Sequence, residues 1–162
     1  MTEFRDREFR DTMGQFCTGV VIVAGLDEGE MTGFAAQSFV SLSLEPPLIA
    51  VCPAKSSTSW PRIRSAGHFC INVLADDQRG VSETFARSGE VADIGWRAGV
   101  SGAPILDGVL AYVDCALDAE HDAGDHTIAV GRVLDIDILD GSGDPLLFFR
   151  GAYGGFLDTP PR

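Results

Sequence analysis

The sequence predicts a mainly β protein with short helices, folded as a β-barrel with helical additions. Many short segments rich in β-branched and aromatic residues recur at regular spacing, separated by glycine, proline and acidic turns. No strand-like segment leads into a GxGxxG or GxxxxGK[ST] loop, and strands and helices do not alternate as in parallel α/β proteins. A chain of 162 residues can bury one core, so we expect a single domain over residues 1–162.

The N-terminal third begins with a helix and continues as strands. Residues Glu3 to Phe16 place apolar side chains at helical spacing and predict a short amphipathic helix. The run from Val20 to Ala24 and the segment from Met31 to Ala35 flank an acidic, glycine-containing turn and predict a hairpin. Two more strands are predicted by SFVSLSL and LIAVC, on either side of the Pro46-Pro47 pair.

The middle of the chain predicts two short helices around one strand. Pro61 marks the start of a helix after the polar loop KSSTSW, and the strand from His68 to Leu74 follows. In DDQRGVSETFARS, Val81 and Phe85 are four residues apart, which places them on one helical face. The glycine-rich residues 89–102 predict an irregular loop.

Two long alternating segments predict a hairpin near the C-terminal end. LAYVDCALDAEHDA and HTIAVGRVLDIDIL are joined by the acidic turn HDAGDH. In the first of them, alternation assigns side chains to opposite faces: Leu110, Tyr112 and Asp114 to one, Ala111, Val113 and Cys115 to the other. The segment PLLFFRGAYGGF predicts one more strand.

Charge and cysteine content argue against several classes of function. Twelve basic and twenty-four acidic residues give a net charge of -12, which disfavours phosphate contacts with DNA or RNA. No apolar run approaches the roughly 20 residues of a membrane helix, and the charged start MTEFRDREFRD does not resemble a secretory signal. We therefore expect a cytoplasmic protein without membrane partners, with its four cysteines as buried, reduced thiols: Cys17, Cys52, Cys70 and Cys115.

Two segments contain residues suited to binding a phosphorylated, flat ligand. In GFAAQSFVSLSLEPPL, small residues would let a flat ring approach the backbone, although a strand with a polar face explains the same pattern. In CPAKSSTSW, four hydroxyl residues follow Lys55, the only lysine, and could hold a phosphate group. A helix cap in a polar loop explains these hydroxyl residues equally well.

The turn HDAGDH contains two histidines and two aspartates, which raises the question of a metal ion. A tight turn directs such side chains poorly toward one ion, and Asp-Gly sequences favour turns for backbone reasons. We therefore expect no metal site, and His126, where the strand resumes, is the better candidate for a functional histidine. No GxSxG motif is present.

Together these segments resemble the flavin reductase-like, FMN-binding split-barrel family. Its members are short-chain NAD(P)H:flavin oxidoreductases that serve two-component monooxygenases. The resemblance runs from about Phe9 to Phe156, and seven pieces carry it in the same order: FCTGVVIVAG, GFAAQSFVSLSLEPPL, KSSTSW, GHFCINVL, GAPILDGVLAYVDC, HDAGDHTIAVGRV and PLLFFRGAYG. Within the family the chain looks most similar to reductase partners of actinobacterial phenol-type hydroxylases, including those that act on steroid-derived phenols.

The resemblance implies a fold, a reaction and a site. It implies a split barrel that reduces FMN or FAD with NADH, or with NADPH, and supplies reduced flavin to a separate oxygenase. The flavin site would lie at a homodimer interface, with His126 as the catalytic residue over the nicotinamide side. The hydroxyl-rich loop would hold the flavin phosphate, and Ala35 stands where the family often has threonine. The implied cofactor-binding residues are Ala35, Ala36, Gln37, Ser38, Phe39, Ser41, Pro53, Lys55, Ser56, Ser57, Thr58, Ser59, Trp60, Asn72, Phe85, Asp125, Arg150 and Tyr153.

Two other functions stay open at this point. One is a flavin-binding carrier or redox module without NADH turnover, and the other is an FMN-dependent oxidase of the same fold. Oxidation of NADH in the presence of free flavin distinguishes the reductase from both.

Overall fold

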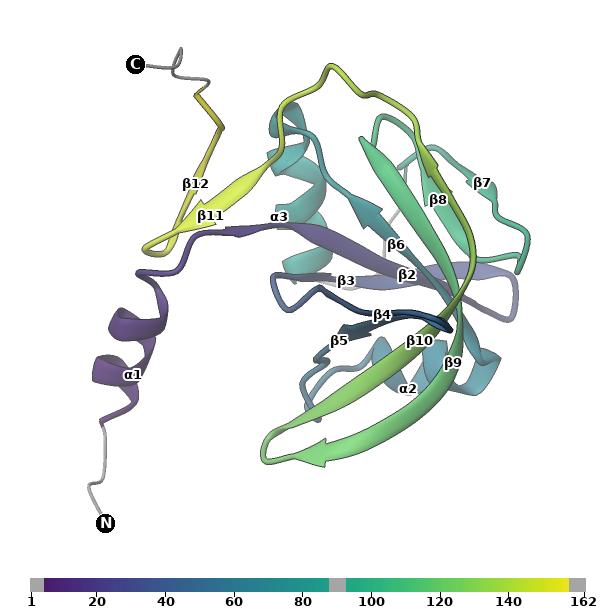
Figure 1. The fold of residues 1–162 in the computed structure, drawn as a ribbon, viewed down its shortest axis with the longest axis horizontal. Helices are drawn as coiled ribbons and strands as arrows, with labels where there is room; N and C mark the ends of the chain where they lie inside the picture. The colour runs from purple at the N-terminus through teal and green to yellow at the C-terminus, as the bar shows by residue number, and fades with distance from the viewer. Residues whose placement is uncertain (1–4, 88–92, 158–162) are drawn as a thin grey trace.

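The computed structural model describes residues 5–87 and 93–157, and its fold is mainly β, as predicted. Within these residues the largest sheet is antiparallel, with the strand order β3-β2-β6-β9-β10-β5-β4. Its edge strands are joined by residues 37–39 alone, a link that spans roughly 14 Å at most. The sheet therefore curls until its edges approach each other, which gives the barrel in Figure 1. The strands are β2 (Val21–Asp27), β3 (Glu30–Ala36), β4 (Val40–Leu44), β5 (Pro47–Val51), β6 (His68–Val73), β9 (Ala111–Ala123) and β10 (His126–Ile138).

The hairpin predicted near Val20 is confirmed as β2 and β3. Asp27 pairs with Glu30, so the turn contains only Glu28 and Gly29. Both turn residues have positive φ, at 51° and 85°, which is the geometry of two-residue hairpins and which glycine adopts without strain.

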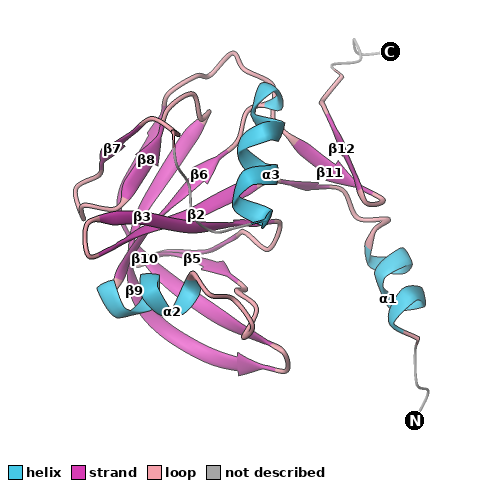
Figure 2. Cartoon of the chain, turned by 180° about the vertical axis from the view of Figure 1, so that it is seen from behind, coloured by secondary structure: helices cyan, strands magenta, loops and turns pink. Residues whose placement is uncertain are grey.

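Strand β2 is apolar from Val21 to Ala24, where both of its faces are covered. Val21 and Val23 pack in one core cluster with Trp60 and Ile63 of α2 (Trp60–Ala66). Ile22 and Ala24 pack in a second cluster with Phe85, a residue of α3 (Arg79–Arg87), which follows the 3₁₀ turn η1 (Asp76–Gln78). Figure 2 shows the two helices on either side of β2 and β3.

The long C-terminal hairpin, β9 and β10, is confirmed together with its alternation. Val113 and Cys115 lie against the α2 side of the core, whereas Tyr112 packs against Ala103 and Ile105. That second face is covered by the short hairpin of β7 (Trp96–Ala98) and β8 (Pro104–Leu106).

The prediction of an irregular loop over residues 89–102 is wrong where β7 forms; residues 88–92 lie outside the described residues. The Asp114 carboxylate is fully buried on β9. It accepts two hydrogen bonds from Ser101, one from the backbone N–H at 2.8 Å and one from the side-chain hydroxyl at 2.5 Å. This long-range bond holds the segment against the barrel, and no local periodicity signals it.

The remaining elements form an extension from the barrel, which we call the arm and define as residues 5–19 and 147–157. It contains α1 (Asp6–Met13) and a three-stranded sheet of β1 (Thr18–Gly19), β11 (Leu147–Phe149) and β12 (Ala152–Gly154). Figures 1 and 2 show α1 standing away from the barrel, and none of its residues is buried.

Two sequence predictions for the arm need correction. The single strand expected over PLLFFRGAYGGF is a hairpin that turns at Arg150 and Gly151, because both residues adopt positive φ. The predicted helix over Glu3 to Phe16 is shorter in the structure, and Glu3 and Phe4 lie outside the described residues.

The expectation of four buried thiols is also wrong for two of them. Cys17 is exposed because it lies in the arm, and Cys52 is half-buried where the chain leaves β5. Cys70 and Cys115 are buried, and burial, helped by the nearby Asp114 carboxylate, raises the pKa of the Cys70 thiol and raises that of Cys115 to about 12. None of the described helices is long and apolar enough to cross a membrane.

Candidate active site

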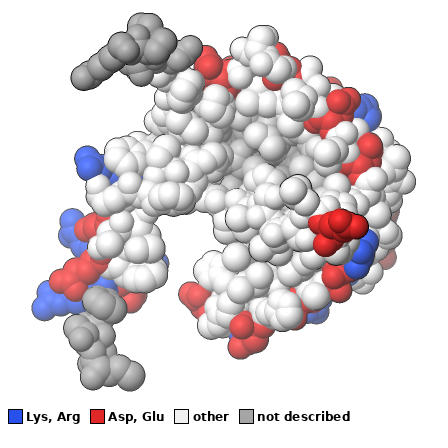
Figure 3. All heavy atoms as spheres, in the orientation of Figure 1, with Lys and Arg blue, Asp and Glu red and all other residues white. Residues whose placement is uncertain are grey.

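A cleft of about 1070 Å³ lies between the barrel and the arm, and Figure 3 shows the hollow between the two parts. Its walls come from the end of β3, the loop after β5, helix α3, the start of β10 and the arm. This volume is slightly above the range of about 300–1,000 Å³ that is typical of small-molecule sites. Eight of the predicted site residues line it: Ala35, Ala36, Gln37, Ser38, Ser57, Phe85, His126 and Tyr153.

The loop after β5 and the tip of the β9–β10 hairpin are fastened to each other. The Thr127 N–H donates to the Pro53 carbonyl at 2.9 Å, and the Lys55 N–H donates to the Asp125 carbonyl at 2.9 Å. The Lys55 ammonium group also forms an ion pair with the carboxylate of Asp122. These contacts bring the hydroxyl-rich loop next to His126, although the two segments are about seventy residues apart in the sequence.

The hydroxyl-rich loop divides into ligand-accessible and structural residues. Lys55, Ser56 and Thr58 are exposed, and Ser57 lines the cleft. The Ser57 hydroxyl also accepts the N–H of Trp60, the first residue of α2, at 3.1 Å, whereas Ser59 at the N-cap position makes no side-chain cap bond. The loop therefore offers a phosphate group one ammonium and several hydroxyl donors.

Trp60 and Ser59 belong to the barrel rather than to the cleft wall. The Trp60 ring packs edge-on against Phe34 and Phe69, with ring centroids 6.2 and 5.8 Å away. Its indole N–H donates to the Glu120 carboxylate at 2.9 Å. Both side chains are buried, and neither is among the residues that line the cleft.

The end of β3 offers a flat ligand both small side chains and backbone groups. Ala35 and Ala36 pair with Ile22 and Val21, and β3 lies at the edge of the sheet. One set of N–H and C=O groups on an edge strand points away from its neighbour and can bond to a ligand. The Ser38 hydroxyl accepts the Cys52 N–H at 3.0 Å and so ties this strand end to the hydroxyl-rich loop.

His126 is half-buried at the start of β10 and is oriented by the residue before it. Its Nδ1 lies 2.7 Å from the Asp125 carboxylate, and this hydrogen bond holds the pKa of Asp125 below its ordinary value. A carboxylate only accepts hydrogen bonds, so the proton is on Nδ1, and in the neutral ring Nε2 carries the lone pair. Asp125 itself is exposed and does not line the cleft.

Other predicted site residues are placed away from the cleft. Phe39 lines a second, smaller cavity of about 300 Å³, Ser41 is exposed on β4, and Pro53 is buried. Arg150 lies at the turn of the arm, where its Nε donates to Gln15 at 2.9 Å. These residues remain predictions as ligand contacts.

Asn72 is buried and fully engaged in the barrel. Its Oδ1 accepts the Leu106 N–H at 2.8 Å, and its Nδ2 donates to the Pro104 carbonyl at 3.1 Å. These bonds attach β8 to the barrel. In this structure its side chain therefore has a structural role.

Several cleft residues escaped the sequence analysis. Phe9 and Met13 come from α1, Phe148 from β11, and Ser82 from α3. The spacing of Phe9 and Met13 marks the apolar side of a helix, but nothing local shows that this side faces a cleft. Across residues 5–87 and 93–157, no group of three or more His, Cys, Asp or Glu side chains could hold a metal ion.

Comparisons with known proteins agree with this geometry. The family described as "Flavin reductase like domain" matches residues 13–156. The chain is 48% identical over 151 residues to the reductase subunit HsaB of a flavin-dependent monooxygenase from Rhodococcus jostii, covering 92% of this chain and 77% of that protein. It is 44% identical over 151 residues to the FMN reductase (NADH) SmoA from Agrobacterium fabrum, covering 93% and 86% of the two chains.

A solved structure is also similar to this chain. The Streptomyces globisporus NADH:FAD oxidoreductase SgcE6, in complex with NAD and FAD fragments, superposes with a TM-score of 0.90 at 31% identity and covers 99% of each chain. The family match spans most of the chain, and both sequence relatives are far above the level of chance similarity. The chain belongs to the flavin reductase-like family.

Proposed function

We propose that this protein is an NAD(P)H:flavin oxidoreductase that reduces FMN or FAD with NADH and supplies the reduced flavin to a separate oxygenase. The observation that carries the proposal is the cleft, which brings the hydroxyl-rich loop, the small-residue end of β3 and His126 to one place. The names of the relatives support it, since HsaB is a reductase subunit, SmoA an FMN reductase, and SgcE6 an NADH:FAD oxidoreductase.

The residues present fit a flavin nucleotide. Lys55, Ser56 and Thr58 are exposed beside the cleft and offer donors for a phosphate group, and Ser57 lines the cleft itself. Ala35 and Ala36 leave room for a flat ring against the edge of β3, and Phe85 and Tyr153 offer apolar contact from other walls. When bound, the flavin and the nicotinamide supply the hydride acceptor and donor, so the protein needs no acid, base or nucleophile of its own for that transfer.

The residues of the chain then bind and orient. Backbone N–H groups at the end of β3 can stabilise negative charge on a ring edge without reorganising. His126, held by Asp125, contributes its Nε2 and an aromatic edge to the nicotinamide side of the cleft. The walls must keep two rings stacked with reacting atoms roughly 3–3.5 Å apart, which makes the spacing between arm and barrel important.

We further propose a homodimer in which the arm packs on a second copy. The arm carries six exposed large apolar side chains on its 26 residues: Phe9, Met13, Phe16, Phe149, Phe156 and Leu157. The arm carries four arginines and three acidic residues, in a chain whose net charge is -12. It is therefore complementary in charge to the acidic barrel of a partner copy, and Figure 3 shows blue and red side chains mixed along it.

The exposed Cys17 thiol supports a cytoplasmic location, because a free surface thiol persists in a reducing compartment. SmoA is an FMN reductase and SgcE6 an NADH:FAD oxidoreductase, so both FMN and FAD are candidate flavins. The oxygenase partner would be a protein that consumes reduced flavin.

The first test mixes the purified protein with NADH and either FMN or FAD and follows the NADH absorbance band. Flavin-dependent loss of NADH is expected, and the faster flavin is the preferred one. Flavin binding without NADH oxidation, also with NADPH, would instead favour the carrier or redox module. A parallel titration with riboflavin, which lacks the phosphate, should give weaker binding than FMN, and Lys55→Ala should reduce that difference.

The second test changes the histidine. His126→Ala is expected to raise the KM for NADH more than it weakens flavin binding, because His126 lies toward the nicotinamide side. His121→Ala, an exposed histidine on β9 of the same hairpin, is the matched control and should leave both values unchanged. Unchanged NADH kinetics in His126→Ala would remove this residue from the site.

A further inference from the structure

The arm and the barrel meet at a small set of contacts beside the cleft. The chain passes between them at Gly19–Val20 and at Leu146–Leu147. On the arm, the rings of Phe148 and Tyr153 pack edge-on against each other, with centroids 5.1 Å apart. Both rings also pack against the barrel cluster that contains Phe85. Tyr153 also reaches α3 through its hydroxyl group, which lies 3.0 Å from the Ser82 hydroxyl.

The Ser82–Tyr153 contact is unusual because of where Ser82 lies. Ser82 is only 1% exposed, and a buried hydroxyl needs a hydrogen-bond partner. A serine in a helix can bond to the carbonyl four residues earlier, but here its oxygen bonds to a side chain from the arm. Within residues 5–87 and 93–157, no other side-chain hydrogen bond joins the arm to the barrel.

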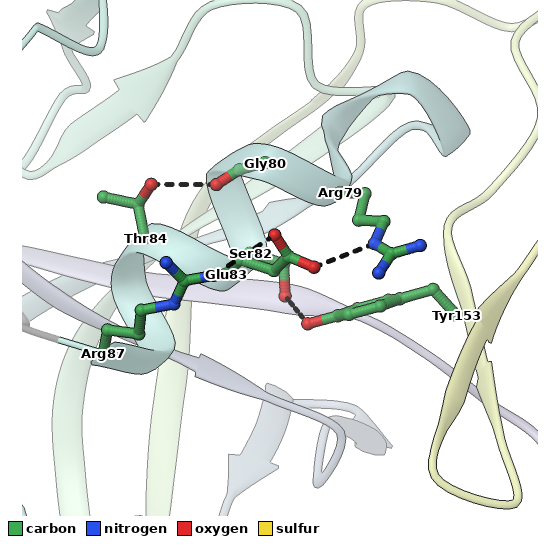
Figure 4. Close-up of polar contacts among 7 residues, drawn as sticks. All are labelled: Arg79, Gly80, Ser82, Glu83, Thr84, Arg87 and Tyr153. Atoms are coloured by element: carbon green, nitrogen blue, oxygen red, sulfur yellow. Dashed lines mark hydrogen bonds and ion pairs between the residues drawn. The ribbon is translucent and has the colours of Figure 1, made fainter.

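A second contact holds the same ring. The Arg79 guanidinium lies over Tyr153, with its carbon 5.2 Å from the ring centroid. Glu83 fixes Arg79 in turn, accepting its Nε–H at 2.8 Å, and also pairs with Arg87 at 3.5 Å. Figure 4 shows this chain of contacts along α3, with the Tyr153 ring reaching toward Ser82 and Arg79 from the arm.

The cleft gives this contact a consequence for ligand binding. Ser82 and Tyr153 both line it, and Phe9, Met13 and Phe148 form its arm-side wall. Because one wall of the cleft belongs to the arm and the other walls to the barrel, the spacing between arm and barrel sets the width of the cleft. We propose that Ser82 is a positioning residue: its hydroxyl holds Tyr153, and through it the arm, at the spacing that two stacked rings require. This inference rests on the proposed function for what the cleft binds, but not for the contact itself.

The test removes one hydroxyl at a time, with Ser82→Ala, Tyr153→Phe and the double variant. Each single variant should raise the KM for NADH and the Kd for flavin about fivefold, with kcat changed less than twofold. The double variant should resemble the single variants, because the two hydroxyls act as one unit. Additive effects, or none, would overturn the inference.

The matched control is Thr84→Val on the same helix. The Thr84 hydroxyl is exposed and donates to the Gly80 carbonyl at 2.9 Å, away from Tyr153 (Figure 4). This variant should leave KM and Kd at their wild-type values. An equal change in Thr84→Val would mean that α3 is merely sensitive to lost hydroxyls, and it would contradict the positioning role.

A second readout does not depend on turnover. Hydrogen exchange of the α1 amides, measured without ligand, should become about fivefold faster in Ser82→Ala and in Tyr153→Phe, but not in Thr84→Val. Faster exchange in a protein that does not oxidise NADH would reject the proposed function while supporting the contact. Unchanged exchange in an active reductase would reject the contact alone.

Discussion

The barrel and the arm differ in how they bury apolar side chains: the barrel encloses a core but also exposes residues such as Leu44 and Ile138, whereas no residue of α1 in the arm is buried. In the barrel, Ile22, Val23 and Phe69 are completely buried. In the arm, Phe9 and Met13 of α1 are 57% and 54% exposed, and Phe16 is 78% exposed. The barrel thus completes its own core within one chain, whereas the apolar side chains of the arm line the cleft or lie at the surface, where we propose that a second copy packs. We therefore expect stability to depend mainly on the barrel, and the proposed dimer and ligand spacing to depend on the arm.

The largest contrast is expected in thiol reactivity. At pH 8, Cys17 on the arm should react quickly with a disulfide reagent, whereas Cys70 and Cys115 should react more than about a thousandfold more slowly, because labelling them requires unfolding. Peptide mapping of the labelled protein measures this. Cys52 lines the cleft, so its half-buried thiol should lose reactivity when FMN is added. Rapid labelling of Cys115 would contradict a closed barrel.

Truncation of one phenylalanine in each region should separate stability from assembly. Phe69→Ala is expected to cost about 3–5 kcal/mol of unfolding free energy, since it empties a site between Trp60 and the sheet. Phe16→Ala should change the unfolding free energy of the monomer by no more than about 0.5 kcal/mol. Denaturant titration at low protein concentration gives both values. Similar losses of unfolding free energy in the two variants would contradict the difference between barrel and arm.

A charge placed on the arm should weaken the proposed homodimer. Phe16→Asp is expected to raise the dissociation constant at least about tenfold, because a carboxylate would be buried in an apolar interface. Sedimentation velocity across a range of concentrations measures it. Val100→Asp is the control, since Val100 is similarly exposed, at 70%, but lies on the barrel near β7. Equal dissociation of both variants would place the interface elsewhere.

The smallest effect is expected at the hairpin tip, where Asp125 meets His126. The lowered pKa of Asp125 means that its contribution to stability is present above the ordinary value of 3.8 and is lost as pH falls through the lower folded value. Asp125→Asn should therefore lower the Tm by about 2 °C or less at pH 6, and the difference should decrease below pH 4. A difference that increases toward acid pH would show that the carboxylate is not held by His126.

Much of the fold could be predicted because it follows from local patterns. Alternation predicted β9 and β10 with the correct faces, and the apolar run after Val20 predicted β2 and its hairpin. The errors occur where distant residues decide the structure. β7 depends on its pairing with β8 and on the buried Asp114, and the second strand of the arm hairpin depends on positive φ at Arg150.

The residue types of the site could be predicted from the sequence, but not which of those residues line the cleft and which have a structural role. The hydroxyl-rich loop and His126 were recognised from residue types, and eight of the implied residues line one cleft. The residue type of Asn72 suits either ligand binding or a structural role. Its hydrogen bonds to Leu106 and Pro104 in the folded chain identify the structural role, which is to hold β8. Ser82 carries no sequence signal at all, because its partner is 71 residues away.

By itself, the sequence determined the mainly β class, the strands whose faces alternate, the absence of Rossmann and P-loop motifs, and the residues suited to a phosphorylated flat ligand. These properties follow from side-chain periodicity and local backbone preference, which act over a few residues. Tertiary structure decided that the hydroxyl-rich loop lies beside His126, that Trp60 belongs to the core, and that the arm forms one wall of the cleft. Those outcomes depend on hydrogen bonds and packing between segments that are far apart in the sequence, and such contacts exist only once the chain has folded.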